Sequence, residues 1–144
     1  MNAKDYLRQV NKLDKLISNK IIEKEQWKAI ATGITARSDG ERVQASGSQQ
    51  KMADAVCKYV ELENEIDRYI DALIDAKKEV ISTIEILPPV EYDLLHKIYI
   101  QDKTLDEVAD KYKKTYSWAT TVHGRALKHV QDILNMRGAK NEQI

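Results

Sequence analysis

The chain has little of what disulfide scaffolds, metal sites and membrane proteins need. Its 144 residues include no Phe, one Cys, two Pro and five Gly. The single cysteine, Cys57, cannot form an internal disulfide, and no His/Cys cluster has the spacing of a metal site. No apolar run approaches the roughly 20 residues that span a bilayer, and the N-terminus lacks the apolar core of a signal peptide. We therefore expect an all-α cytoplasmic protein with no cofactor, metal or membrane.

Neither sign of charge is in excess, because the chain has 23 Lys and Arg residues and 23 Asp and Glu residues. Any surface for nucleic acid must therefore come from local segregation of charge. Such segregation is present, because no acidic residue lies between Lys111 and Gln131. Catalytic machinery is not evident: Ser117 has no base at a defined spacing, and no glycine-rich phosphate loop occurs. We expect a protein that is not an enzyme.

The segment 87–134 predicts a helix-turn-helix. Pro88 and Pro89 suit the first turn of a short helix, where a missing N–H costs nothing. Thr104 and Glu107 have the spacing of a capping box at the start of a second helix. Lys113 and Lys114 then form a turn, and Thr115 is a plausible N-cap for a third helix. The apolar stripe of this third helix comprises Ala119, Val122, Ala126, Leu127 and Val130.

If that stripe faces inward, the opposite side of the third helix faces solvent. The N-terminal part of such a helix enters the major groove, where hydroxyl groups hydrogen-bond to base edges. The predicted base-contacting residues are Tyr116, Ser117, Thr120 and Thr121. Cations around them suit phosphate contacts, which supply salt-dependent affinity without reading sequence. The predicted phosphate-contacting residues are Lys111, Lys113, Lys114, Arg125 and Lys128.

The run LPPVEYDLLHKIYIQDKTLDEVADKYKKTYSWATTVHGRALKHV resembles region four of bacterial sigma factors. The matching positions are Leu87-Pro88, Glu91, Leu95, Tyr99, Thr104, Glu107-Val108-Ala109 and Arg125-Ala126-Leu127. The whole chain is similar to small phage and prophage regulators of the ArpU/RinA type, including a joint like Arg42–Gln49. This resemblance implies activation of late operons, with RNA polymerase as a further partner.

The chain also departs from the sigma pattern. Lys113 stands where sigma-like modules usually carry Gly, so a positive φ there would cost roughly 1 kcal/mol. Tyr, Ser and Thr replace the usual Arg, Glu and Gln of the recognition helix. The operator sequence is therefore not implied by the resemblance.

The first half predicts two long helices, at about 3–31 and 50–87, joined by a polar loop at about 35–50. The second helix has a heptad repeat, which favours pairing with the first helix as an antiparallel hairpin. Its apolar surface is wider than one seam requires, so we also expect a homodimer or higher homo-oligomer. The expected oligomerisation seam comprises Met52, Tyr59, Ile66, Leu73 and Val80. Cys57 lies beside this seam and is expected to be at least half-buried.

These patterns predict an oligomerisation region at 1–87 and a DNA-binding domain at 88–144. The expected function is sequence-specific regulation of phage or prophage transcription through double-stranded DNA. Two alternatives stay open: a DNA-packaging adaptor of small-terminase type, and a helical interaction protein that does not bind DNA. The first predicts a ring of many subunits, and the second predicts no salt-dependent DNA binding.

Overall fold

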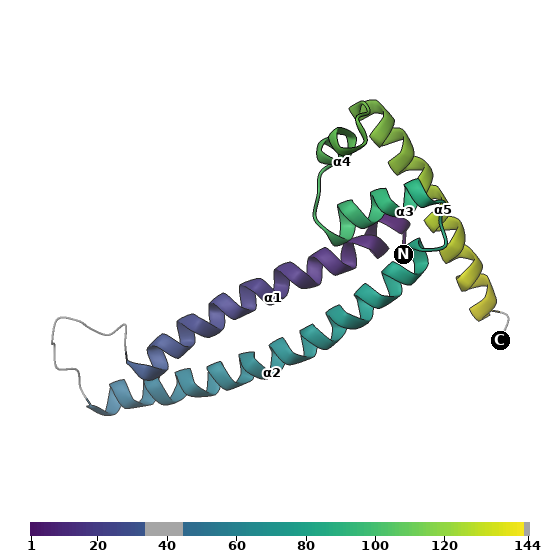
Figure 1. The fold of residues 1–144 in the computed structure, drawn as a ribbon. Coiled ribbons are helices and arrows are strands. Elements are labelled where there is room, and N and C mark those ends of the chain that lie inside the picture. Colours follow the sequence, from purple (N-terminus) through teal and green to yellow (C-terminus); the bar gives the residue numbers. More distant parts are fainter. Residues whose placement is uncertain (34–44, 143–144) are drawn as a thin grey trace. The chain divides into compact units, whose positions relative to one another are not determined.

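The computed structural model describes residues 1–33 and 45–142, and every secondary-structure element within these ranges is a helix (Figure 1). The elements are α1 (Ala3–Thr32), α2 (Ala45–Ile84), α3 (Pro89–Leu95), η1 (His96–Ile100, a π-helical turn), α4 (Leu105–Tyr112) and α5 (Tyr116–Glu142). The all-α prediction is confirmed. The second helix was predicted at about 50–87 and instead runs from Ala45 to Ile84, so it begins and ends earlier than predicted; residues 34–44 of the expected loop lie outside the described ranges.

The chain forms two compact units, and their limits differ from the expected division at residue 87. One unit, Leu13–Ala72, contains most of α1 and α2. The other combines Met1–Lys12 with Leu73–Ile144, so both ends of the sequence belong to the unit that holds the predicted helix-turn-helix. A core of apolar side chains explains this grouping, since Leu7 and Val10 of α1 are buried in the same cluster as residues of α3 and α5.

In the unit Leu13–Ala72, α1 and α2 run antiparallel (Figure 1). Lys20 Nζ lies 3.5 Å from the Glu65 carboxylate, and Lys24 Nζ lies 5.7 Å from the centre of the Tyr59 ring. The side chains buried between the helices include Ile17, Ala55, Leu62 and Ile66. The hairpin expected from the heptad pattern is confirmed.

The expected oligomerisation seam contributes to packing within one chain. Ile66 is buried in the α1–α2 unit, and Tyr59 stacks against Lys24 of α1. Leu73 and Val80 belong instead to the core of the other unit. Association between chains stays a prediction. Cys57 was expected to be at least half-buried, and this is wrong: its side chain is exposed, because it lies off the seam on α2.

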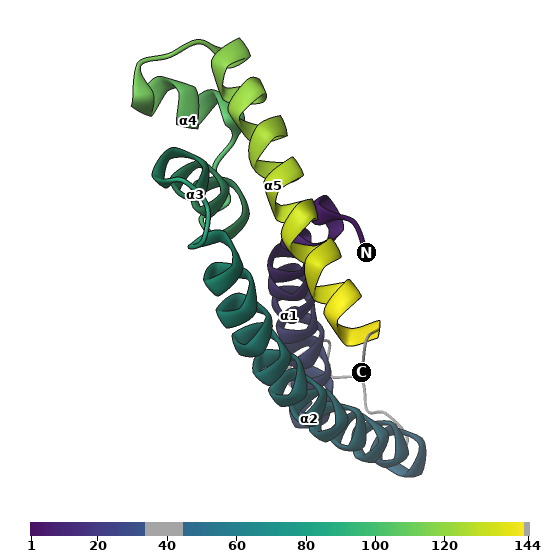
Figure 2. The same ribbon diagram turned by 90° about the vertical axis from the view of Figure 1, so that its right-hand side faces the viewer.

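In the unit with the predicted helix-turn-helix, α3 and α4 lie beside α5 (Figure 2). The start of α1 and the end of α2 complete the core of this unit. Its fully buried side chains come from all of these helices and include Leu7, Ile84, Leu94, Leu95, Val108 and Val130. The sequence therefore builds a helix-turn-helix whose hydrophobic core depends on residues before position 12 as well as those after position 73.

One polar cluster is buried within this core. Thr83, a polar residue near the end of α2, is fully buried. Its hydroxyl donates to the carbonyl of Glu79 at 3.0 Å and accepts from Arg137 Nη1 at 2.7 Å. Because the Thr83 hydroxyl donates its single proton to Glu79, it accepts the bond from the Tyr6 hydroxyl, whose oxygen lies 2.8 Å away. The cluster joins α1, α2 and α5 through bonds that satisfy the buried hydroxyl.

Candidate nucleic-acid interface

The turn between α4 and α5 is built from the capping signals that the sequence predicts. Thr104 Oγ1 accepts from the Glu107 amide at 3.1 Å, and the Glu107 carboxylate accepts from the Thr104 amide at 3.2 Å. Lys113 ends α4 in the left-handed conformation, with φ 57° and ψ 42°. Thr115 Oγ1 then accepts from the Trp118 amide at 3.0 Å and caps α5. The capping box, the strained turn residue and the next N-cap are all confirmed.

The third helix buries the predicted stripe. Ala119, Val122, Ala126 and Val130 are each at most 3 % exposed, and Leu127 is partly buried. The N-terminal part of the opposite face is open to solvent. Tyr116 is 54 % exposed, Ser117 and Thr121 are exposed, and Thr120 is half-buried.

The two threonine hydroxyls of this face bond to their own helix. Thr120 Oγ1 and Thr121 Oγ1 each donate to the carbonyl of Ser117 at 2.9 Å. With their protons engaged in this way, both oxygens can act toward a ligand only as acceptors. This arrangement suits donors on base edges, such as the exocyclic amino groups of adenine and cytosine.

Cationic side chains surround the exposed face. Lys111, Lys113, Lys114, Arg125 and Lys128 all lie at the surface. Arg125 differs from the lysines, since its Nε donates to the Glu91 carboxylate at 3.0 Å while 54 % of its side chain stays exposed. A guanidinium held at Nε keeps its two Nη groups for another acceptor. Arg125 is thus oriented by the protein and still accessible.

Glu91 is a residue whose role the sequence pattern did not reveal. Its side chain is 4 % exposed and accepts bonds from α5, at 3.0 Å from Arg125 Nε and 2.6 Å from His129 Nδ1. A buried carboxylate needs such partners, because desolvation without compensation costs several kcal/mol. The sequence shows that Glu91 lies near the start of α3, but it does not show the two partners of its carboxylate. Arg125 and His129 are 34 and 38 residues away and come next to Glu91 only when α3 packs on α5.

A second polar cluster fixes the end of α4 against α3. Lys97 Nζ bonds to Asp93 at 2.7 Å, the Tyr112 hydroxyl bonds to the same carboxylate, and the Tyr112 ring packs on Trp118 with centroids 5.2 Å apart. Burial acts to raise the pKa of Asp93, but the bonds from Lys97 and Tyr112 outweigh it and lower that pKa. Burial and the bond to Asp93 raise the pKa of Tyr112 to about 12. Trp118 is half-buried by this packing.

One histidine of α5 faces the core side of the helix. His123 Nε2 lies 2.8 Å from the Tyr99 hydroxyl, and the two rings stack at 5.8 Å. Burial lowers the pKa of His123, and the positive charges of Lys4 and Arg8 lower it further. Burial also raises the pKa of Tyr99. The imidazole is therefore favoured in its neutral form inside the folded unit.

Gly124 lies on the exposed face of α5, one turn beyond Thr120 and Thr121. A Cβ atom built at this position meets no heavy atom within 4 Å in the described structure. Gly in a helix costs about 1 kcal/mol relative to Ala. Packing of another described helix does not account for this glycine. The surface there is unobstructed.

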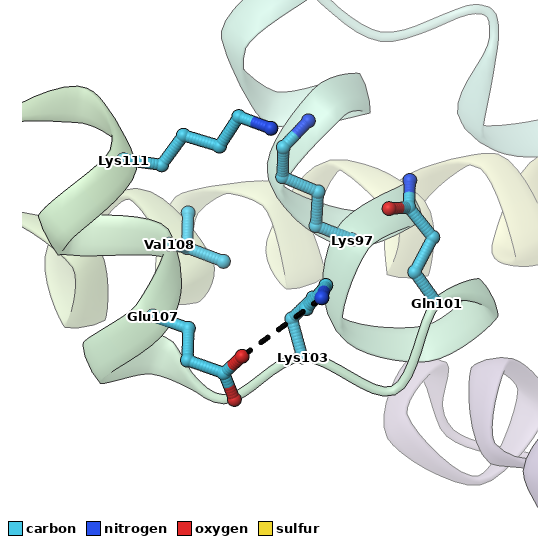
Figure 3. A pocket seen from close by; sticks show the side chains of 6 residues that line it. All are labelled: Lys97, Gln101, Lys103, Glu107, Val108 and Lys111. Atoms are coloured by element: carbon cyan, nitrogen blue, oxygen red, sulfur yellow. Dashed lines mark ion pairs between the residues drawn. The ribbon is translucent and has the colours of Figure 1, made fainter.

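The unit also has a small pocket at the start of α4 (Figure 3). The pocket is lined by Lys97, Gln101, Lys103, Glu107, Val108 and Lys111. Its volume of about 130 Å³ is below the several hundred Å³ typical of ligand sites. Two of its lysines already have carboxylate partners, Lys97 at Asp93 and Lys103 at Glu107. The pocket therefore does not suggest a cofactor site.

Across residues 1–33 and 45–142, no three His, Cys, Asp or Glu side chains are grouped as ligands for a metal. None of the helices in the same ranges is long and apolar enough to cross a membrane. Comparisons of the chain with protein-family models, curated proteins and solved structures give no match.

Proposed function

We propose that this protein is a sequence-specific, DNA-binding transcription regulator in which α5 is the recognition helix. The observation that carries the proposal is the exposed start of α5, where hydroxyl side chains are surrounded by cations and no acidic residue intervenes between Lys111 and Gln131. Such a surface meets both needs of a DNA-reading helix, phosphate contacts for affinity and base contacts for discrimination.

Three further features support this proposal. The N-terminus of α5 adds the positive end of a helix dipole to the lysines of the preceding turn. Val122, Ala126 and Val130 pack the opposite side of the helix into the hydrophobic core. Glu91 orients Arg125 at the edge of the same face. Together these features present a rigid surface, which base readout requires.

The resemblance to region four of sigma factors and to ArpU/RinA-type regulators suggests the setting of this activity. We propose late phage or prophage operons as the target, with activation through RNA polymerase. Footprinting on DNA upstream of such operons tests this part of the proposal. A protected promoter-proximal site supports it, and protection confined to DNA far from promoters contradicts it.

The DNA-binding proposal is tested by two pairs of substitutions on the same helix-turn-helix. Lys113→Ala with Lys114→Ala should weaken binding to every duplex and reduce the slope of log K against log salt by about 2. Thr120→Ala with Thr121→Ala should leave that slope unchanged and alter the preference between sequences. Equal effects of both pairs would exclude α5 as a recognition helix, and no salt-dependent binding by the wild type would exclude the function.

A further inference from the structure

A row of exposed side chains follows one flank of α2 within the unit Leu13–Ala72. The α2 flank consists of Val56, Val60, Glu63, Asp67 and Ile70. Their spacing alternates between four and three residues, so the side chains lie along one face of the helix. This face is distinct from the buried row of Ala55, Leu62 and Ile66 that packs on α1. The exposed fractions of its apolar members are 48 % for Val56, 47 % for Val60 and 38 % for Ile70.

The acids in the middle of the α2 flank are not compensated within the described residues. Neither Glu63 nor Asp67 has a Lys, Arg or His nitrogen within 4 Å there, whereas neighbouring Glu65 pairs with Lys20. Glu63 and Asp67 are four residues apart on one helix, and like charges at this spacing destabilise a helix slightly. The α2 flank therefore combines three exposed aliphatic side chains with two acids that have no ion-pair partner among the described residues.

Pairing the α2 flank with a second copy of itself would bring like charges together. A parallel pair places Glu63 beside Glu63 and Asp67 beside Asp67. An antiparallel pair that matches Val60 with Ile70 is centred on residue 65, and it places Glu63 beside Asp67. Both arrangements put acids opposite acids, which is unfavourable at a helix–helix interface.

We infer that the α2 flank binds an amphipathic helix of another protein, with Lys or Arg at two central positions and aliphatic side chains on either side. The cations meet Glu63 and Asp67, and the aliphatic residues cover Val56, Val60 and Ile70. At 1.5 Å per residue, the α2 flank extends over about 21 Å, so a partner helix of about four turns matches it. This surface lies in a different unit from the candidate DNA interface and does not rest on the proposed function.

The exposed thiol of Cys57 allows a direct test with the full chain. It is the single cysteine of the sequence and lies next to Val56, so one dye can be attached there without substitution. The probes are two synthetic helical peptides of about 15 residues, each with a second dye. They share aliphatic positions and differ only in carrying two Lys or two Glu at the centre. Energy transfer between the dyes reports binding at the α2 flank.

The wild type should bind the Lys-centred peptide about fivefold more tightly than the Glu-centred peptide, since exposed ion pairs contribute modestly. Glu63→Lys with Asp67→Lys should reverse this preference. The matched control is Asp54→Lys with Glu61→Lys, which makes the same change in net charge at exposed positions on another face of α2. This control should keep the wild-type preference. Circular dichroism checks that all variants remain helical.

Three results would overturn the inference. The first is equal binding of the two peptides by the wild type. The second is a preference lost in the Asp54/Glu61 control as much as in the Glu63/Asp67 variant, because the effect would then reflect net charge. The third is a dimer in sedimentation that Val60→Ser with Ile70→Ser dissociates, because a second copy would then occupy the α2 flank.

Discussion

The Nε of Arg125 donates to the buried carboxylate of Glu91 across 3.0 Å, joining the middle of α5 to the start of α3. Removing either partner should destabilise the unit, but not equally. Arg125→Gln leaves a buried carboxylate with His129 as its remaining side-chain partner and should cost about 2 kcal/mol. Glu91→Gln leaves cations that solvent reaches and should cost about 1 kcal/mol. Urea unfolding measures both values.

A double-substitution cycle provides the control for this prediction. Glu91→Gln combined with Arg125→Gln should cost less than the sum of the single changes, since the two side chains interact directly. Strictly additive costs would show that the bond contributes nothing to stability. DNA affinity is expected to fall more with Arg125→Gln than with Glu91→Gln, because the first change also removes a predicted phosphate contact.

The half-buried imidazole of His123 should make stability depend on pH. Its pKa is lowered in the folded unit, so the unfolded chain takes up a proton at higher pH than the folded chain does. The contribution of this group to stability is complete above the unfolded pKa of about 6.5 and is lost as pH falls toward the lower folded pKa. His123→Gln should therefore flatten the decline in unfolding free energy between pH 7 and pH 5.

Asp93 acts in a lower pH window and can be separated from His123. Its folded pKa lies below 3.8, so its contribution to stability is present above the ordinary pKa and is lost as pH falls through the folded value. Asp93→Asn should leave the profile between pH 7 and pH 5 parallel to that of the wild type. A change of slope in this range for Asp93→Asn, or none for His123→Gln, would contradict the assignment.

Lys113 occupies a backbone conformation that favours glycine. Lys113→Gly should raise the unfolding free energy by about 1 kcal/mol, because φ is +57° and a side chain is strained there. Lys113→Ala is the control, since it removes the same charge and retains the strain. In both variants the slope of log K for DNA binding against log salt should be smaller by about 1, because one cation is lost. Equal unfolding free energies of the two variants would contradict the prediction that the positive φ at residue 113 costs stability.

The unobstructed surface at Gly124 can be tested by filling it. Gly124→Ala should stabilise the unit by up to 1 kcal/mol, and Gly124→Gln should also fold but weaken DNA binding by obstructing close approach. Gly138 on the same helix is the matched control, because a Cβ there also meets nothing within 4 Å. Gly138→Gln should leave DNA binding unchanged. Gel shifts on one duplex compare the variants.

Leu7 should matter to the helix-turn-helix although it lies far from it in sequence. It is fully buried in the core with α3 and α5, so Leu7→Ala should cost about 2–5 kcal/mol. Ile22→Ala on the same helix is the control, because Ile22 is 57 % exposed and should change stability by less than about 0.5 kcal/mol. A similar loss in both variants would contradict this account of the core.

Local signals made much of this fold predictable. Thr104, Thr115 and the pair of prolines act within one turn of their own positions, and each ends or begins a helix as predicted. The inward stripe of α5 follows from the helical period alone. The bonds of Glu91 to α5 and of Tyr6 to Thr83 could not be predicted from local signals. They depend on contacts between residues 34 to 77 positions apart, which neither periodicity nor capping specifies.

The amide of Ala3 donates to the Gln131 side chain at 2.8 Å, so the first helical turn is attached to the middle of the last helix. During translation, residues 3–10 leave the ribosome long before the segment that they pack against. A growing chain thus has no complete helix-turn-helix core until residue 130 has emerged. Nascent fragments that stop before residue 130 should lack the contacts that hold α5 in place, so any promoter recognition requires translation to pass this residue.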